Sequence, residues 1–352
     1  MNLLNRYAMT LNTSALLSLV SVLSLSFLPS VSAQERPFRL AAGPQSSVFA
    51  ALVSAQLDES SKLAKPEIIV GTTAEGFSAF CRPPSPETVD IILSSREMTR
   101  TEEERCAQAG VRNIIEGQLG YFAQVLLQKI DEPPLSLTTN DIYRAFAAVI
   151  PSAEEFKSNA TKVWNDLNVT YPKSAIRLFI TSTAQGSRRV FDFEAMADGC
   201  RNVPQIREIF GATQRTTLCT NLRKDVVVED DSTPNRLEAL KKAPAGALLL
   251  TSYDVYLENQ VWTRLVPING VRPSPEAVVQ EDYTLTTPLF IIAKGNLFRS
   301  LEGQNSSLFP WLTEAFSERA IGNNGYLVKS GLMPLSLSKR EAGRSELKKL
   351  NN

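Results

Sequence analysis

Short apolar runs alternate along this chain with segments whose apolar residues recur at helical spacing. The runs predict strands at 38–42, 66–70, 89–93, 114–115, 121–127, 176–180 and, after a turn, within 244–251. The intervening segments predict helices at 48–57, 75–80, 137–146, 189–196, 237–242 and from Thr99 onward, with a polar loop at 152–159. Strands that alternate with helices indicate a parallel sheet of the α/β class.

Four of the predicted strands end in turns rich in hydroxyl side chains, and each turn is followed by a predicted helix. These turns lie at 43–47, 71–73, 94–96 and 181–188. The carboxyl ends of parallel strands meet at one edge of a sheet, where ligands bind. A helix N-terminus there offers unpaired amide groups and a partial positive charge. The pattern therefore predicts an anion site built from hydroxyl groups and amides.

Residues 1–33 have the anatomy of a secretory signal peptide. Arg6 precedes an apolar stretch at 15–28, which ends in a small-x-small cleavage pattern at 31–33, before Gln34. An uncleaved membrane anchor is the alternative, but the stretch is short and serine-rich for a span of about 20 apolar residues. We therefore expect export to the periplasm with cleavage of this segment.

Composition narrows the function further. Lys plus Arg and Asp plus Glu both number 37, so no basic field exists to attract nucleic acid. The absence of histidine removes the usual general base and the commonest ligand of transition metals. The acidic run 229–231 lacks the longer alternation of oxygen ligands that a calcium loop needs, and is interpreted as a solvated loop. We expect a non-catalytic protein with no metal or cofactor.

The four cysteines, Cys81, Cys106, Cys200 and Cys219, form no C-x-x-C pair. An even number in an oxidising compartment suggests two disulfides. Of the three connectivities we predict local pairing, Cys81–Cys106 and Cys200–Cys219, and each bond would stabilise the fold by roughly 3 kcal/mol. Four buried free thiols are the alternative.

The order of motifs resembles the periplasmic phosphate-binding proteins of ABC importers, in a branch with two cysteine pairs. The resemblance covers almost all of the chain after the signal segment. It is carried by Phe80-Cys81, Asp90-Ile91, Ser94-Ser95-Arg96, Cys106-Ala-Gln-Ala-Gly-Val, Leu119-Gly120-Tyr121, Trp164-Asn165-Asp166-Leu167, Gln185-Gly186-Ser187-Arg188-Arg189-Val190-Phe191, Ile268-Asn269-Gly270-Val271-Arg272-Pro273 and the stretch 283–294.

This resemblance implies a type II periplasmic binding protein fold, with two α/β lobes joined by two crossover strands and a ligand cleft between them. It places the first lobe at 34–119 plus 285–352 and the second at 120–284. It also implies phosphate or a related oxyanion as ligand, and an ABC permease and ATPase at the inner membrane as partners. We expect a monomer that binds no nucleic acid.

The resemblance also assigns site residues. Ser47 matches the hydroxyl of the first turn, and Val48 supplies the next amide. The match is ambiguous by one residue, so Ser46 is the alternative to Ser47. The remaining matches are Thr73 in the second turn, Ser95 and Arg96 in the third, and Gln185, Gly186, Ser187 and Arg188 in the fourth. Hydroxyl groups and amides donate to oxyanion oxygens, and a guanidinium pairs with two of them at once.

Several positions depart from the pattern of the family, among them Phe122 and Ala123, which stand where many relatives have Asp-Gly. Glu75 places a carboxylate in the second turn, Gln185 replaces a serine hydroxyl, and Thr287 stands where relatives have arginine. We interpret Glu75 as pointing to solvent; as an acceptor it could alternatively receive a proton from a protonated oxyanion. These departures keep a second hypothesis open, a divergent binding module that acts as an extracytoplasmic sensor.

Overall fold

The computed structural model describes residues 37–58, 65–83, 85, 87–152, 155–209, 211–295 and 308–348. The predicted signal peptide at 1–33 lies outside these ranges. None of the helices within them combines the length and apolarity that crossing a bilayer requires.

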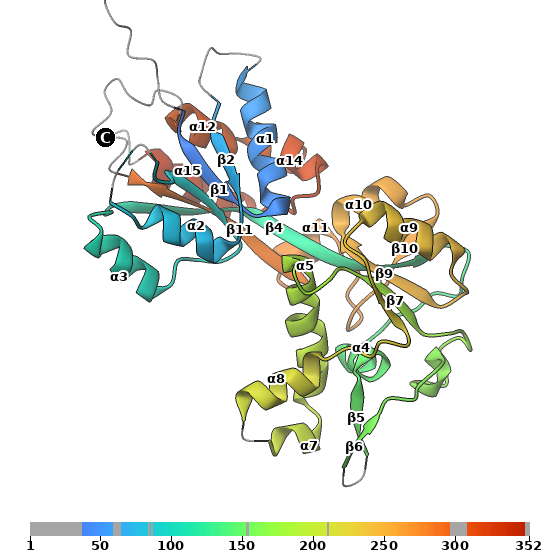
Figure 1. Ribbon diagram of the computed structural model, residues 1–352. Helices are drawn as coiled ribbons and strands as arrows, with labels where there is room; N and C mark the ends of the chain where they lie inside the picture. The colour runs from blue at the N-terminus through green and yellow to red at the C-terminus, as the bar shows by residue number, and fades with distance from the viewer. Residues whose placement is uncertain are drawn as a thin grey trace, which may run out of the picture. The chain divides into compact units, whose positions relative to one another are not determined.

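Nine strands of the described residues form one mixed sheet (Figure 1). They are β1 (Arg39–Ala42), β2 (Glu67–Val70), β3 (Ile91–Ser94), β4 (Ile114–Lys129), β7 (Arg177–Ile180), β8 (Val227–Glu229), β9 (Ala247–Ser252), β10 (Thr263–Leu265) and β11 (Thr286–Lys294). The order across the sheet is β2-β1-β3-β11-β4-β9-β7-β8, and β10 pairs with β4 beside this path. Strands β2, β1 and β3 pair in parallel, as do β9, β7 and β8, which confirms the predicted α/β class.

Strand β4 connects the two parallel groups. Its residues 114–123 pair with β11, which lies beside β3, whereas residues 124–127 pair with β9. The sequence predicted two separate strands at 114–115 and 121–127, and the structure joins them into one strand of 16 residues. The result is two α/β lobes whose strands are joined through β4, while β11 pairs with β3 and with the first part of β4.

The helices cover both groups of strands. They are α1 (Pro44–Asp58), α2 (Thr73–Phe80), α3 (Arg100–Gln108), α4 (Thr139–Phe146), α5 (Gly186–Val190), α6 (Asp198–Arg201), α7 (Pro204–Arg207), α8 (Ala212–Thr220), α9 (Thr233–Lys242), α10 (Tyr253–Asn259), α11 (Pro275–Val279), α12 (Leu308–Ala315), α13 (Glu318–Ile321), α14 (Tyr326–Lys329) and α15 (Leu337–Lys348). A 3₁₀ turn, η1 (Trp164–Asp166), and a π-helical turn, η2 (Phe191–Ala197), complete the set. The π-helical turn joins α5 to α6 without a break.

Two further predicted segments differ from the structure. Helix α1 begins at Pro44 rather than at Val48, so Ser46 and Ser47 lie in its first turn instead of in a preceding loop. Proline suits this position because it needs no amide partner there and its φ is already helical. The predicted loop at 152–159 is largely a hairpin, β5 (Val149–Ser152) with β6 (Glu155–Ser158).

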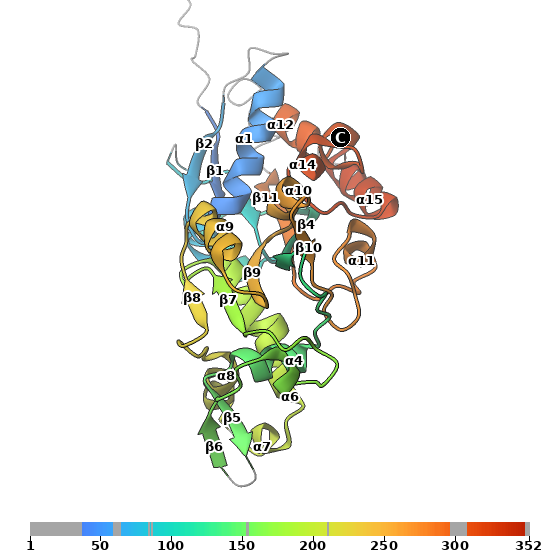
Figure 2. The same cartoon turned by 90° about the vertical axis from the view of Figure 1, so that its right-hand side faces the viewer.

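Each group of strands has its own hydrophobic core. In the first, Phe38 on the β1 side packs edge-on against Trp311 of α12, with ring centroids 5.8 Å apart. The Trp311 indole donates to Ser54 of α1 over 3.0 Å. Helices α12, α14 and α15 therefore lie beside the first strands although they come last in the chain (Figures 1 and 2).

In the second core the indole of Trp164 is fully buried and donates to the carbonyl of Gly246 over 2.8 Å. The ring of Phe146, from α4, packs edge-on against it at 5.9 Å between centroids. Buried apolar residues between 38 and 122 and between 289 and 347 form two clusters on the first group of strands. Those between 123 and 285, together with Met333, form two clusters on the second. The exact lobe limits of 119/120 and 284/285 stay a prediction.

Both predicted disulfides are present. Cys81 bonds to Cys106 and Cys200 to Cys219, with Cα atoms 4.2 and 5.5 Å apart. The first ties the end of α2 to α3, and the second ties α6 to α8. The alternative of free thiols was wrong.

Candidate functional site

The predicted turns of the first lobe lie side by side at one edge of the sheet. Because β1, β2 and β3 are parallel, their carboxyl ends share this edge. The amide of Gly71, after β2, donates to the carbonyl of Ala42, the last residue of β1, over 2.9 Å. The hydroxyls of Thr73 and Ser95 lie 3.2 Å apart, which joins the turn after β2 to the turn after β3.

The hydroxyl groups of the first turn are engaged locally. Ser46 is buried, and its hydroxyl donates to the carbonyl of Gly43 over 3.2 Å. The hydroxyl of Ser47 donates to the carbonyl of Pro44 over 2.8 Å. Each oxygen can still accept, and a hydroxyl that rotates can donate elsewhere. Val48 is exposed, but α1 begins at Pro44, so the Val48 amide lies beyond the unpaired amides of the helix start. The amide of Ser47, one residue earlier, already donates to the carbonyl of Gly43 over 2.8 Å.

Glu75 lies at the start of α2, where its carboxylate closes a capping box. The amide and hydroxyl of Thr72 both donate to Glu75 Oε2 over 2.8 Å, while the Thr72 oxygen accepts from the Glu75 amide. The Thr72 amide and hydroxyl lower the pKa of Glu75, so the group is ionised near neutral pH. Glu75 is exposed, as interpreted from the sequence, but it is bound to its own helix rather than simply pointing away.

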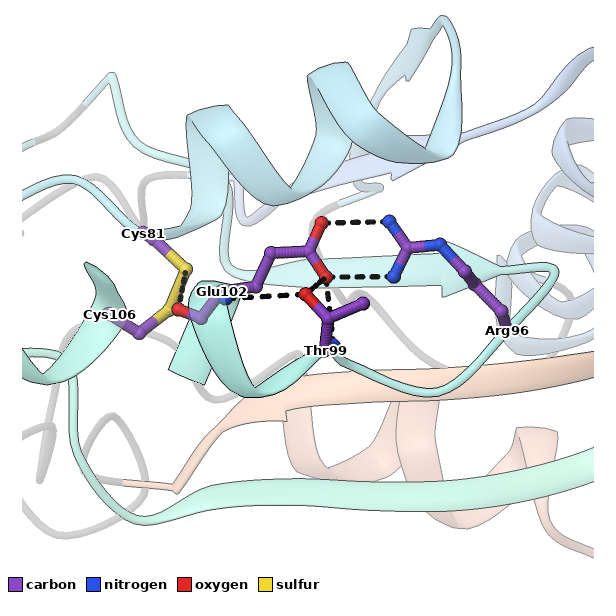
Figure 3. Close-up of a disulfide and its surroundings, with 5 residues drawn as sticks. All are labelled: Cys81, Arg96, Thr99, Glu102 and Cys106. Carbon is purple, nitrogen blue, oxygen red and sulfur yellow. Dashed lines mark hydrogen bonds and ion pairs between the residues drawn. A yellow bond between two sulfur atoms is a disulfide. The ribbon is translucent and has the colours of Figure 1, made fainter. Parts of the chain in front are cut away.

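Arg96 follows β3, and its guanidinium is held by a carboxylate of α3. Figure 3 shows Glu102 facing it end-on, with Nη1 and Nη2 donating to the two carboxylate oxygens over 2.7 and 2.8 Å. The hydrogen bonds from Arg96 and then those from Thr99 lower the pKa of Glu102 to about 2 although burial opposes them. The charge of Arg96 is therefore cancelled within its own lobe.

The predicted turn of the second lobe, 181–188, runs from β7 into α5. The hydroxyl of Ser187 lies 3.4 Å from that of Thr181, and the amide of Gln185 donates to the carbonyl of Ser182 over 3.1 Å. Gly186 stands at the start of α5 with open space beside it, since an added Cβ would meet no atom within 4 Å. Gln185, Gly186 and Ser187 thus form one accessible turn.

Arg188 is buried in this turn between two carboxylates. Its Nε donates to Asp192 over 2.8 Å and its Nη1 to Glu229 over 2.5 Å. Burial alone would lower the pKa of Arg188, but the hydrogen bonds to the two carboxylates raise it overall, and the group stays charged. The side chain is 4% exposed, so in this structure Arg188 supports the turn rather than facing solvent.

The acidic run after β8 holds the second-lobe turn in place. Asp231 accepts from the amide and the hydroxyl of Ser182 over 2.8 and 2.9 Å. The Ser182 amide, and then its hydroxyl, lower the pKa of this carboxyl. The interpretation of residues 229–231 as a loop open to solvent therefore missed two structural contacts, those of Asp231 and Glu229.

The structure brings the predicted residues together within each lobe. Ser46, Ser47, Val48, Thr73, Ser95 and Arg96 gather after β1, β2 and β3, and Gln185, Gly186, Ser187 and Arg188 gather after β7. None of the hydrogen bonds described above joins the first group to the second. Sequence reasoning missed the carboxylates that pair with both arginines. Only one had a readable signal: the Thr99-x-x-Glu102 capping box places Glu102 six residues after Arg96.

Comparisons with known proteins agree with this fold. A profile of the family described as the PBP superfamily domain matches residues 34–303. No curated protein matches the sequence.

Similar solved structures include a possible phosphate binding protein from Planctomyces limnophilus, with 17% identity, 91% of this chain and 100% of that one covered, and a TM-score of 0.59. PstS from Borrelia burgdorferi has 14% identity; the match covers 86% of this chain and 100% of that one, with a TM-score of 0.55. An ABC-type phosphate transport receptor from Vibrio cholerae has 11% identity; the match covers 85% of this chain and 100% of that one, with a TM-score of 0.54. At such identities the likeness shows a shared fold.

Proposed function

Because the chain belongs to the family of the PBP superfamily domain, we propose that it is a solute-binding protein that captures phosphate or a similar tetrahedral oxyanion for an ABC importer. Two of the solved structures with this fold are named in their own right for phosphate binding or phosphate transport. The proposal includes a non-catalytic role, a periplasmic location reached through a cleaved segment at 1–33, and partnership with a permease and an ATPase.

The observation that carries the proposal is the meeting of hydroxyl groups at the strand ends of the first lobe. Thr73 and Ser95 come from turns 22 residues apart, yet their oxygens lie 3.2 Å from each other at the N-terminus of α2. Hydroxyl donors at a helix N-terminus suit the several oxygens of a tetrahedral anion. The accessible turn at Gln185, Gly186 and Ser187 supplies the matching donors of the second lobe.

Both arginines of the site are paired with carboxylates, so recognition depends on directed hydrogen bonds more than on net charge. Arg96 is balanced by Glu102, and Arg188 by Asp192 and Glu229. Hydrogen bonds between charged groups and oxyanions are geometrically selective. We therefore expect discrimination among oxyanions of different shape and protonation rather than general anion binding.

Titration calorimetry with phosphate, sulfate, arsenate and organic phosphates tests the proposal. We expect phosphate to bind with micromolar or tighter affinity, and Ser187→Ala or Ser95→Ala to weaken it at least tenfold. Ser158→Ala, on the distant hairpin strand β6, is the matched control and should bind as the wild type does. No heat with any of these oxyanions would refute the assignment and favour the sensor hypothesis.

A further inference from the structure

Arg96 is fixed from three directions. Its two terminal nitrogens donate to Glu102, and Nη1 also donates to the carbonyl of Glu97 over 3.0 Å. The guanidinium carbon lies 4.9 Å from the centre of the Phe77 ring of α2, a cation–π contact. The guanidinium thus lies between α2 and α3.

Glu102 itself has little freedom. It is 9% exposed, and besides Arg96 it accepts from the amide and the hydroxyl of Thr99 over 2.9 and 2.8 Å. Its helix is tied to α2 by the disulfide Cys81–Cys106, and Cys81 Sγ lies 3.4 Å from the Glu102 carbonyl oxygen (Figure 3). A carboxylate held this firmly sets the direction of the group that it binds.

A guanidinium has five N–H donors in a rigid fork. The contacts described for Arg96 use both hydrogens of Nη1 and one of Nη2: the end-on pair binds Glu102, and the second Nη1 hydrogen binds the Glu97 carbonyl. They leave Nε–H and the second Nη2–H, which lie parallel on the side of the fork. A pair of parallel donors is the arrangement that binds two oxygens of one oxyanion.

We propose that Glu102 is a positioning residue of the anion site: it takes the end-on edge of Arg96 and so presents the side-on edge, Nε and Nη2, to two oxygens of the ligand. This inference rests on the proposed function, and it adds that Glu102 fixes the orientation of Arg96 towards the ligand. Glu102 does not touch the ligand; it acts through Arg96.

The variant Glu102→Gln separates this role from a simple effect of charge. Removing a negative charge beside an anion site would tighten anion binding if charge alone mattered. Loss of the positioning carboxylate should instead weaken phosphate binding at least tenfold in titration calorimetry, because a single amide oxygen cannot hold both terminal nitrogens. Affinity that is unchanged or tighter in Glu102→Gln would overturn the inference.

Glu104→Gln provides the matched control, because it makes the same substitution on α3 at a carboxylate that pairs with the exposed Arg100 and contacts neither Arg96 nor Glu102. Phosphate affinity should therefore change less than threefold. A loss in Glu104→Gln as large as that in Glu102→Gln would assign the effect to the charge of the helix and refute a positioning role. In an Arg96→Lys background, Glu102→Gln should have no further effect, because lysine lacks the fork.

The Nε–H resonance of Arg96 in an NMR spectrum tests the orientation independently of affinity. In the wild type we expect a sharp signal that moves when phosphate is added, and in Glu102→Gln a broadened signal near the position of a free arginine. A wild type that binds no phosphate but keeps the sharp signal would refute the proposed function, while the orientation of Arg96 by Glu102 would still hold. A broad signal in both proteins would refute that orientation itself.

Discussion

The pairing of Glu102 with Arg96 predicts how the free energy of unfolding falls in acid. The perturbation is Glu102→Gln, which keeps the size of the side chain but removes its titration. In the folded protein the Arg96 hydrogen bonds, followed by those from Thr99, hold the pKa of Glu102 at about 2, against an ordinary value of 4.5. The folded state therefore stabilises the ionised form of Glu102.

The sign follows from linkage between protonation and folding. A pKa that is lower in the folded state contributes stability above the unfolded value of 4.5, and this contribution is lost as the pH falls from 4.5 towards 2. The full shift corresponds to about 3.4 kcal/mol. The Arg96 side chain is 40% exposed, so solvent screens the pair and about 2 kcal/mol is the expected contribution at pH 7. About 1 kcal/mol of it should be lost by pH 3.5.

Urea unfolding followed by tryptophan fluorescence measures this contribution. The wild type and Glu102→Gln are compared from pH 7 to pH 3.5, and the difference between their free energies of unfolding is plotted against pH. Other carboxyls titrate in both proteins and cancel in the difference. The reasoning requires the difference to shrink in acid; a difference that stays constant, or grows, would refute it.

Two further predictions concern packing and covalent links. Gly199→Ala should destabilise the fold by about 3 kcal/mol or more, because its Cβ would lie 1.9 Å from the carbonyl oxygen of Thr139; Gly186→Ala, which meets no atom, should change the free energy of unfolding by less than about 0.5 kcal/mol in the same urea titration. Replacing both Cys200 and Cys219 by serine should lower the free energy of unfolding by roughly 3 kcal/mol, since the closed loop spans 19 residues. An unfolding midpoint equal to that of the wild type, in Gly199→Ala or in the double serine variant, would contradict the corresponding prediction.

The strand ends and the disulfides could be predicted because their signals are local. Hydroxyl-rich turns after apolar runs indicated where Thr73 and Ser95 lie, and the structure brings them into contact. The cysteines were predicted to pair with their neighbours along the sequence, and the structure contains those pairs. The helix start at Thr99 was predicted for the same reason, whereas the capping box between Thr72 and Glu75 was missed although its sequence pattern is equally short.

The continuity of β4 could not be predicted, because two glycines interrupt its apolar pattern. An added Cβ at Gly117 would lie 2.6 Å from the Phe316 ring, and one at Gly120 would lie 2.4 Å from the carbonyl oxygen of Met333. Both glycines permit close approach by segments about 200 residues later in the chain. Sequence reasoning interpreted the same residues as a break between strands, since the approaching partner is invisible locally.

The partners of the buried arginine in the second lobe were equally hidden. Glu229 lies 41 positions after Arg188, and they meet only because β7 pairs with β8 in one particular register. A pairing register is a property of the assembled sheet. Residues 229–231 therefore resemble a solvated loop until the neighbouring strand is in place.

The contact of Trp311 with Ser54 closes the core of the first lobe with a helix from the end of the chain. The two residues are 257 positions apart, and the first lobe has no complete core until α12 has been made. Until that point the amino-terminal strands expose apolar surface that chaperones can bind and hold. A chain that completes its first core last stays unfolded for most of its synthesis, and the export that we propose requires an unfolded chain.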